Sequence, residues 1–284
     1  DLRTRHPRLI VCNVSGYGSA GPYAARKAYD LLVQSEVGLL SVTGTEAAPA
    51  RAGISVADIA AGMYAYSGIL TALLARHTTG RGTTVDVSLF DALGEWMGHA
   101  AYYAAYSGTP PPRSGPNHAS IAPYGPVRAG DGGQVYLAIQ NPREWSRFCR
   151  DVLRRSGLEE DARFATNALR VQHRQALHEA IESAFAALTT SDVVARLDSA
   201  QIGWARMNSV AEFLNHPQLA ARDCWRDIGS PAGALRATVP PVRMDGVDPA
   251  MGDVPALGQH TQAILEELGV DRGIVAAWRR EGAI

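Results

Sequence analysis

Asp58 is the carboxylate in this sequence whose surroundings best suit covalent chemistry. It lies where Ser55-Val-Ala-Asp58-Ile-Ala-Ala-Gly62 passes from an extended segment into a long helical pattern. Unpaired N–H groups and the helix dipole at such a position favour the ionised carboxylate. The small side chains beside it leave room for a ligand, so Asp58 could attack an acyl group as a nucleophile. The local pattern alone favours the commoner role of a helix-capping aspartate.

A glycine pattern, Gly16-Tyr-Gly18-Ser-Ala-Gly21, follows a predicted strand and matches the spacing of dinucleotide-binding loops. That motif needs a helix that opens at the third glycine and an acidic residue at the end of the next strand. Here Pro22 follows at once, and Arg26 and Lys27 come soon after it. We therefore interpret the glycines as a tight turn that lets the backbone pass close to a neighbouring group, not as an NAD site.

The histidines and cysteines form no recognised reactive or metal-binding pattern. His173 and His178 are five residues apart, which puts them on different helix faces, and the sequence contains no H-E-x-x-H. It has no G-x-S-x-G either, so seryl hydrolysis has no support. Cys12, Cys149 and Cys224 are far apart and odd in number. We expect buried or free thiols rather than disulfides or a zinc site.

The elements that must position these residues begin with alternating strands and helices. The apolar run 9–14 shows no polar alternation, which is typical of an interior parallel strand. The patterns predict strands over 9–15 and 83–89, and helices over 29–36, 58–77 and 90–106. This order indicates an α/β domain.

A run of prolines and glycines at 108–116 marks the clearest boundary, because four prolines fit neither a helix nor a central strand. The region beyond it reads as α+β, with predicted strands over 125–128 and 134–139 and helices over 142–156, 173–188 and 191–200. Residues 229–257 are again rich in proline and glycine and are predicted to form an extended surface connection. Two short helices are expected after it, over 261–268 and 274–280.

Composition excludes several classes of protein. The 284 residues are 46% hydrophobic and 19% charged, which is enough to bury a sizeable core. The 27 Lys and Arg nearly balance the 28 Asp and Glu, so no overall field attracts nucleic acid or an anionic membrane. Apolar stretches such as 69–75 are interrupted before the ~20 residues of a membrane span, and no secretory segment is seen. We expect a cytoplasmic protein without nucleic-acid or membrane partners.

Several short motifs occur together along the chain: Pro7-Arg-Leu-Ile10, Ser15-Gly-Tyr-Gly18, Gly21-Pro-Tyr23, Lys27-Ala-Tyr-Asp30-Leu-Leu-Val-Gln34, Val56-Ala-Asp58, Gly62, Thr79-Gly-Arg-Gly82, Val85-Asp-Val-Ser-Leu89 and Gly258-Gln-His-Thr261. This combination resembles the class III CoA-transferases, the family of formyl-CoA, carnitine and mesaconyl CoA-transferases and the related 2-methylacyl-CoA racemases. The resemblance covers essentially the whole chain.

The resemblance implies an α/β fold with a Rossmann-like large domain and a smaller α+β domain, in an interlaced homodimer. We assign residues 1–96 and 258–284 to the large domain, 116–225 to the small domain, and 97–115 and 226–257 to linkers. The family begins with a further stretch that helps to build the large domain and contacts the CoA adenine and phosphates. We therefore expect that an N-terminal portion is missing from this sequence.

The resemblance also implies a site. Asp58 falls on the family's catalytic aspartate, which overrides the capping interpretation. Lys27, Tyr29, Gly115 and His118 are the expected contacts of the substrate and of CoA, which enters as the acyl-CoA substrate; no metal is expected. The loop 114–118 matches the position of a glycine-rich loop whose backbone N–H groups would hold developing oxyanions, although Gly115 is its one glycine here.

The implied reaction is CoA transfer from an acyl-CoA donor to a carboxylic acid, through an acyl anhydride and then a CoA thioester of Asp58. The racemases carry histidine where this chain has Tyr29. A phenol, with an ordinary pKa near ~10, is a poor proton-exchange base at neutral pH, so transfer is favoured over racemisation. A racemase-like isomerase and a non-catalytic partner protein or fragment are the alternatives.

The acid that accepts CoA is predicted from a set of aromatic and polar residues: Tyr64, Tyr66, Glu95, Trp96, Tyr102, Tyr103 and the run His118–Tyr124. This set looks closest to the transferases for mesaconate, itaconate, succinate and other C4–C5 dicarboxylic acids. The same aromatic spacing in helices is equally typical of core packing.

Overall fold

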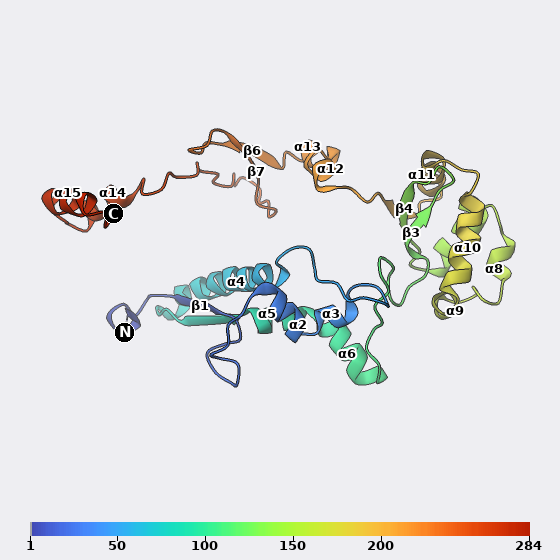
Figure 1. Cartoon of the computed structure of the whole chain (residues 1–284), viewed down its shortest axis with the longest axis horizontal. Helices are drawn as coiled ribbons and strands as arrows, with labels where there is room; N and C mark the ends of the chain where they lie inside the picture. Colours follow the sequence, from blue (N-terminus) through green and yellow to red (C-terminus); the bar gives the residue numbers. More distant parts are fainter. Residues whose placement is uncertain (1) are drawn as a thin grey trace. The chain divides into compact units, whose positions relative to one another are not determined.

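The computed structural model describes residues 2–284 (Figure 1). They divide into two compact units, Asp1–Met207 and Asn208–Ile284. The predicted small domain, 116–225, extends past this division, because the helices after residue 207 lead into a hairpin of the second unit. The assignment of 258–284 to the domain of residues 1–96 stays a prediction.

The first half of unit 1 is built on a parallel strand pair. β1 (Val11–Ser15) pairs with β2 (Thr84–Ser88), with Cys12 opposite Val85. A parallel pair needs a long crossover connection, and α4 (Val56–Thr79) lies within it and packs along both strands (Figure 1). The remaining elements of this half are α1 (Leu2–Arg5), α2 (Asp30–Glu36), α3 (Leu39–Val42), α5 (Leu89–Trp96) and α6 (Gly98–Ser107).

The α4 helix confirms the long helix predicted over 58–77 and extends it at both ends. It stops at Gly80, whose φ of 70° lies in the left-handed region that suits glycine at a helix end. Its buried residues are all alanines: Ala57, Ala60, Ala61, Ala65 and Ala72. These small side chains let α5 and β2 approach the helix closely.

By length and composition alone, α4 is also the one helix within residues 2–284 that could cross a membrane. Serine, threonine and tyrosine interrupt the apolar residues of α4, so the sequence shows no long uninterrupted apolar run there. The most apolar 18-residue stretch of the helix nevertheless has a mean hydropathy of 1.3. In this structure α4 packs on β1, β2 and α5, and 22% of its most apolar 18-residue stretch is buried. The expected absence of a membrane partner stays a prediction.

The helix predicted over 90–106 is two helices. Met97 ends α5 and begins α6, and its N–H is shared between the carbonyls of Leu93 and Gly94. Glycines at 94 and 98 flank this position, and glycine weakens a helix interior. The apolar pattern alone did not reveal the break.

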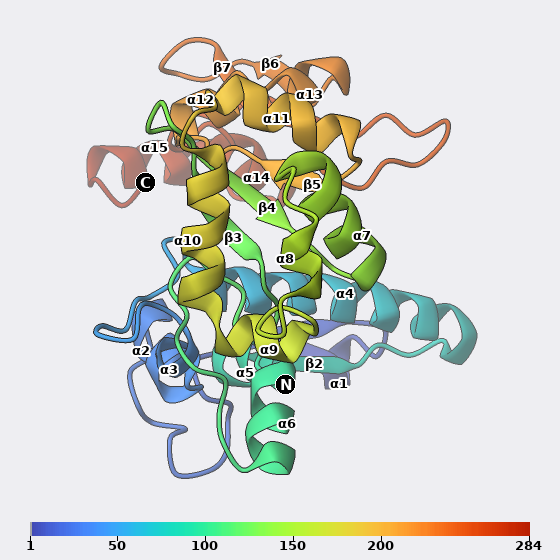
Figure 2. The same cartoon turned by 90° about the vertical axis from the view of Figure 1, so that its right-hand side faces the viewer.

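The second half of unit 1 holds its largest core. β3 (Tyr124–Arg128), β4 (Gln134–Ala138) and β5 (Gly203–Ala205) form an antiparallel sheet in that order, so both predicted strands are confirmed and β5 is an addition. α10 (Arg174–Phe185) packs against β3, and α11 (Thr190–Ser199) against β4 and β5 (Figure 2). The other elements are α7 (Pro142–Arg147), a π-helical turn (Phe148–Val152), α8 (Gly157–Glu160) and α9 (Asn167–Gln172).

Unit 2 corrects the prediction of a purely extended connection over 229–257. β6 (Trp225–Ile228) and β7 (Leu235–Thr238) form an antiparallel hairpin, closed through a turn that contains Gly233 at φ 106°. Proline and glycine, which suggested a linker, serve here as turn residues. The helices of this unit are α12 (Val210–Leu214), α13 (Pro217–Ala221), α14 (Thr261–Glu267) and α15 (Arg272–Arg280).

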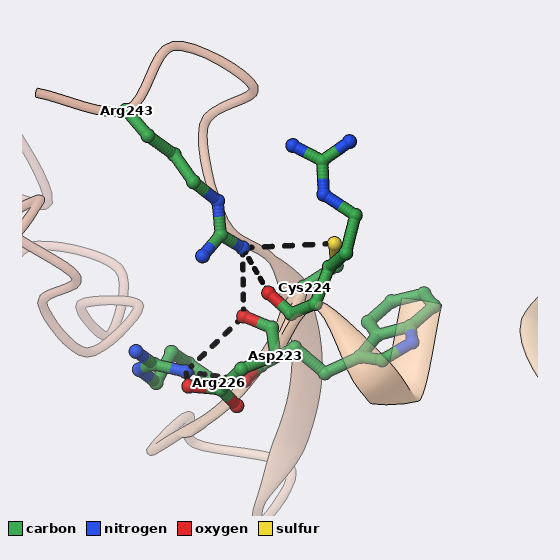
Figure 3. Close-up of polar contacts among 6 residues, drawn as sticks. Asp223, Cys224, Arg226 and Arg243 are labelled. Carbon is green, nitrogen blue, oxygen red and sulfur yellow. Dashed lines mark hydrogen bonds and ion pairs between the residues drawn. The ribbon is translucent and has the colours of Figure 1, made fainter. Parts of the chain in front are cut away.

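Arg243 fastens the chain beyond β7 to the residues that precede β6. Its guanidinium donates to the carbonyls of Arg222 and Asp223, the latter at 3.1 Å, and approaches Cys224 Sγ at 3.6 Å (Figure 3). Arg226 pairs with the Asp223 carboxylate at 2.8 Å. The predicted linker is therefore tied back to the hairpin by side chains as well as by the strand pairing.

Candidate active site

Asp58 lies in the first turn of α4 without capping it. The helix begins at Val56, its N-cap is Ser55, and the Ser55 side chain makes no capping hydrogen bond. The Asp58 side chain is exposed and has no hydrogen bond or ion pair to any residue in 2–284. The capping interpretation is therefore wrong for this chain, and the carboxylate is left open to solvent.

The cap of α4 comes from another carboxylate. Asp30 Oδ1 accepts a hydrogen bond from the N–H of Ala57 at 2.8 Å, and its Oδ2 accepts one from Gln34 Nε2 at 2.7 Å. Gln34, which is 0% exposed, accepts in turn from the N–H of Ala52 at 2.9 Å. Two hydrogen bonds thus tie α2 to the segment that leads to Asp58, and the third joins the two anchoring side chains within α2.

The sequence pattern indicated no role for Asp30 and Gln34 beyond their place in a motif. The available signal was their spacing, because residues four apart face the same side of a helix and a carboxylate with an amide can form one shared network. The hydrogen bonds of Gln34 to Ala52 and of Asp30 to Ala57 join residues far apart in the chain, and no local sequence pattern predicts them.

The structure brings Tyr29 to the same region as Asp58, and Lys27 precedes Tyr29 by two residues in the chain. Tyr29 and Asp58 each adjoin one partner of the Asp30–Ala57 hydrogen bond. Tyr29 is the N-cap of α2, and its side chain is 68% exposed. Lys27 is also exposed, and neither its ammonium nor the Tyr29 hydroxyl has a polar partner within the described chain. All three side chains are available to a ligand.

One backbone donor at this place is also open. The N–H of Asp58 has no hydrogen-bond acceptor among residues 2–284, whereas the N–H of Ile59 already bonds to Ser55 at 3.0 Å. Such an N–H at a helix N-terminus can stabilise negative charge. It lies beside the carboxylate of its own residue, where charge would develop during acyl transfer.

The glycine turn after β1 serves packing. A Cβ atom on Gly16 would collide with the Cβ of Ala28, and no helix opens at Gly21, because the next helix is α2 at Asp30. The interpretation as a tight turn is confirmed, and the group that it passes is Ala28. The same contact holds the segment just before Tyr29 against the end of β1.

Gly115 and His118 lie at a different cavity. It has a volume of about 730 Å³ and is lined by residues from the end of α3, from α6, from the loop 111–120 and from α9. The His118 ring stacks on Tyr124 with centroids 5.1 Å apart. Within the described chain, Asp58 is not part of this lining, so the structure does not join these two residues to the other three.

The expected oxyanion role of the loop 114–118 is not supported by its hydrogen bonds. The N–H groups of Gly115, Asn117 and His118 donate to Gly44, Ser114 and Tyr124, respectively. Pro116 has no N–H to offer. Three of the four N–H groups of this loop are therefore already bonded within the chain, and the N–H of Ser114 is the one without an acceptor among residues 2–284.

Most of the aromatic residues predicted to select the acid are exposed in this structure. Tyr66, Trp96, Tyr102 and Tyr103 are all substantially exposed, up to 66% for Tyr102, whereas Tyr64 packs against a cluster of buried alanines. These residues also lie at different cavities. Tyr103 lines the cavity of His118, while Tyr64 bonds to Glu95 at a separate cavity of about 650 Å³ beside α4 and β2. Their role in selecting the acid stays a prediction.

The three cysteines are free thiols, as predicted. Burial raises the pKa of Cys149 to about 12, so that thiol stays protonated at neutral pH and is a poor nucleophile. Within residues 2–284, no group of three or more His, Cys, Asp or Glu side chains is arranged to hold a metal ion.

Comparison with known proteins identifies the family of this chain. The chain belongs to CoA-transferase family III, whose model matches residues 1–261. It is 35% identical over 288 residues to an acyl-CoA transferase of Fusarium pseudograminearum, covering 100% of this chain and 63% of the relative. It is 32% identical to a succinate–glutarate CoA-transferase of Agrobacterium fabrum, covering 94% of this chain and 67% of the relative.

A solved structure confirms the fold class. The crystal structure of a CaiB/BaiF family protein from Brucella suis is similar with a TM-score of 0.79 and 33% identity, covering 94% of this chain and 70% of that one. The predicted α/β fold with a smaller α+β part is therefore confirmed, while the interlaced homodimer stays a prediction. The chain spans 63% of the length of the Fusarium relative.

Proposed function

We propose that this chain carries the nucleophile of an acyl-CoA:carboxylate CoA-transferase, and that the nucleophile is Asp58. The observation that carries the proposal is an exposed carboxylate in the first turn of a helix whose capping is done by Asp30. A carboxylate that accepts no hydrogen bond keeps its lone pairs available for attack. Family membership supports the class of reaction.

The proposed reaction proceeds in four displacements. Asp58 attacks the thioester carbonyl of the donor, the C–S bond breaks, and an aspartyl acyl anhydride and CoA thiolate form. The thiolate attacks the aspartyl carbonyl carbon, which releases the donor acid and leaves an aspartyl-CoA thioester. The acceptor carboxylate displaces the thiolate to form a second anhydride. The thiolate then attacks the acceptor's acyl carbon and restores the Asp58 carboxylate.

The neighbours of Asp58 have defined roles in this scheme. The ammonium of Lys27 would hold the anionic part of CoA or of the acid, and the hydroxyl of Tyr29 would donate a hydrogen bond to an acyl or carboxylate oxygen. The open N–H of Asp58 would stabilise the oxyanion at the aspartyl carbonyl. Because the two anhydrides and the aspartyl-CoA thioester hydrolyse readily, the complete site must exclude water.

We propose C4–C5 dicarboxylic acids, of the succinate, mesaconate or itaconate type, as substrates. The name of the Agrobacterium relative, a succinate–glutarate CoA-transferase, supports this class. So does the cavity of Gly115 and His118, whose described lining includes two histidines and two asparagines but no Asp or Glu. Such a lining suits a carboxylate. We assign His118 to the distal carboxylate of the acid, in the assembled homodimer.

The experiment that tests the function separates transfer from proton exchange. The protein is incubated in D2O with succinyl-CoA and glutarate, mesaconate or itaconate, and separately with a 2-methylacyl-CoA, and products are followed by mass spectrometry. Because Tyr29 is a poor proton shuttle at pH 7, we expect a new CoA ester and no deuterium at the α-carbon.

Two results would replace this assignment. Rapid α-deuterium incorporation, with no transfer to any tested acid, would make the protein a racemase-like isomerase. If the folded protein, together with any preceding chain that its gene encodes, catalysed neither CoA transfer nor proton exchange, a non-catalytic partner protein would be favoured.

A further inference from the structure

We propose that Asp30 and Gln34 are positioning residues for Asp58, which together hold in place the backbone that carries the nucleophile. This inference rests on the proposed function of Asp58 as the acyl carrier. It assigns neither residue a direct contact with substrate. Their role is to fix the backbone segment 52–57, which leads into the helical turn from which Asp58 projects.

Hydrogen bonds from α2 clamp the segment 52–57 at two points. Gln34 holds Ala52 at 2.9 Å and Asp30 holds Ala57 at 2.8 Å, so the segment 52–57 is fastened at both ends to one helix face. The bond between Gln34 and Asp30, at 2.7 Å, makes the two anchors a single unit. Gln34 and Ala57 are both 0% exposed, whereas Asp30 and Ala52 are half-buried, so the three bonds are partly shielded from water.

The clamp leaves the Asp58 carboxylate without a capping role. An acidic side chain at the third helical position commonly accepts a hydrogen bond from the N–H of the N-cap residue, as Asp192 does from Thr189 in α11. In α4 the capping bond to the first turn comes instead from Asp30, which accepts from the Ala57 N–H. The Asp58 carboxylate accepts no hydrogen bond from the N-cap residue Ser55 and is exposed.

The donor and acceptor order of the clamp allows a charge-swap test. Asp30→Asn keeps the size of the side chain but places one amide NH2 group against another, so one of the three bonds is lost. Gln34→Glu places two carboxylates against each other. The double variant Asp30→Asn/Gln34→Glu restores all three bonds, because the new amide donates to the new carboxylate and the charge has only moved from position 30 to position 34.

The readout is the rate at which Asp58 is acylated by saturating succinyl-CoA, together with KM and the thermal midpoint. For Asp30→Asn and Gln34→Glu we expect acylation about 100-fold slower, with KM little changed, because small misplacements of a reacting group cost about this much. The double variant is expected to recover to within about 10-fold of wild type. A purely structural role would lower the midpoint and leave the acylation rate of folded protein unchanged.

A second variant covers the case in which the double variant does not fold. Gln34→Met keeps length and burial but neither donates nor accepts a hydrogen bond. Alone it should slow acylation as Asp30→Asn does, and combined with Asp30→Asn it should add little, because residues of one network are not additive.

Three outcomes would overturn the inference: single variants that acylate at the wild-type rate, a folded double variant with no recovery, or fully additive losses in the Asp30→Asn/Gln34→Met pair. Failure of the proposed function looks different. In that case the wild type itself transfers CoA, or fails to do so, without ever becoming acylated at Asp58.

Discussion

Asp58→Ala is expected to abolish CoA transfer, by at least about 10⁴-fold, while the protein remains folded. The substitution removes the carboxyl group, whose oxygen or carbon forms the covalent bond in every proposed intermediate. Its effect on stability should stay within about 0.5 kcal/mol, because the side chain is exposed and caps nothing. Asp58→Asn keeps the shape of the side chain and should be equally inactive, since an amide is a far weaker nucleophile.

The matched control is Asp248→Asn, which removes an exposed carboxylate from the loop after β7 and should leave transfer unchanged. Rates are measured by the appearance of the acceptor's CoA ester, and stability by thermal and urea unfolding. If either Asp58 variant kept more than a tenth of the wild-type rate, the residue would not be the acyl carrier.

Phe148→Ala is expected to destabilise the protein by about 3–5 kcal/mol. Phe148 is 0% exposed in the π-helical turn and packs near the ring of Trp145, with centroids 6.2 Å apart. The core of the second half of unit 1 gathers around these rings and the helices α10 and α11. Removing the phenyl group leaves a cavity that the surrounding rigid elements cannot close.

The control for this prediction is Tyr106→Ala, at a residue 87% exposed on α6, which should change the free energy of unfolding by no more than about 0.5 kcal/mol. Urea unfolding followed by circular dichroism measures both variants. A loss below 1 kcal/mol for Phe148→Ala, on the scale of surface substitutions, would show that this packing is not what stabilises the domain.

The sequence predicted the elements whose pattern is strong and local. The apolar run before Gly16, the long helix after Ser55 and the strand pair around Asp131-Gly-Gly133 were all identified within a few residues of their observed bounds. Gly80 and Pro142 mark an end and a start that follow from their backbone preferences. The short strand β5 was missed because three residues carry too little pattern.

The site was predicted less completely, for a physical reason. Asp58 was found through its motif, but its local pattern suggested a capping role. The side chain that caps α4 is that of Asp30, which lies 27 residues before its partner Ala57. Most of the expected donors of the loop 114–118 are likewise bonded elsewhere: Gly115 donates to the distant Gly44, and His118 donates to Tyr124. Which polar groups remain open depends on tertiary pairing, and no short motif encodes it.

The measurement that tests the central claim most directly follows oxygen from the acceptor acid into the enzyme. In the proposed sequence the last displacement leaves one acceptor oxygen on the Asp58 carboxylate. The protein is turned over with succinyl-CoA and glutarate labelled with ¹⁸O in its carboxylates, then digested with trypsin. The peptide between the cleavage sites Arg51 and Arg76 contains Asp58 as its only acidic side chain, so label there is unambiguous.

We expect this peptide to gain ¹⁸O in proportion to turnover, and the same peptide from Asp58→Asn to gain none. Formation of glutaryl-CoA over many turnovers with no ¹⁸O in the wild-type peptide would contradict the account, because CoA would then pass between the acids without an aspartyl intermediate.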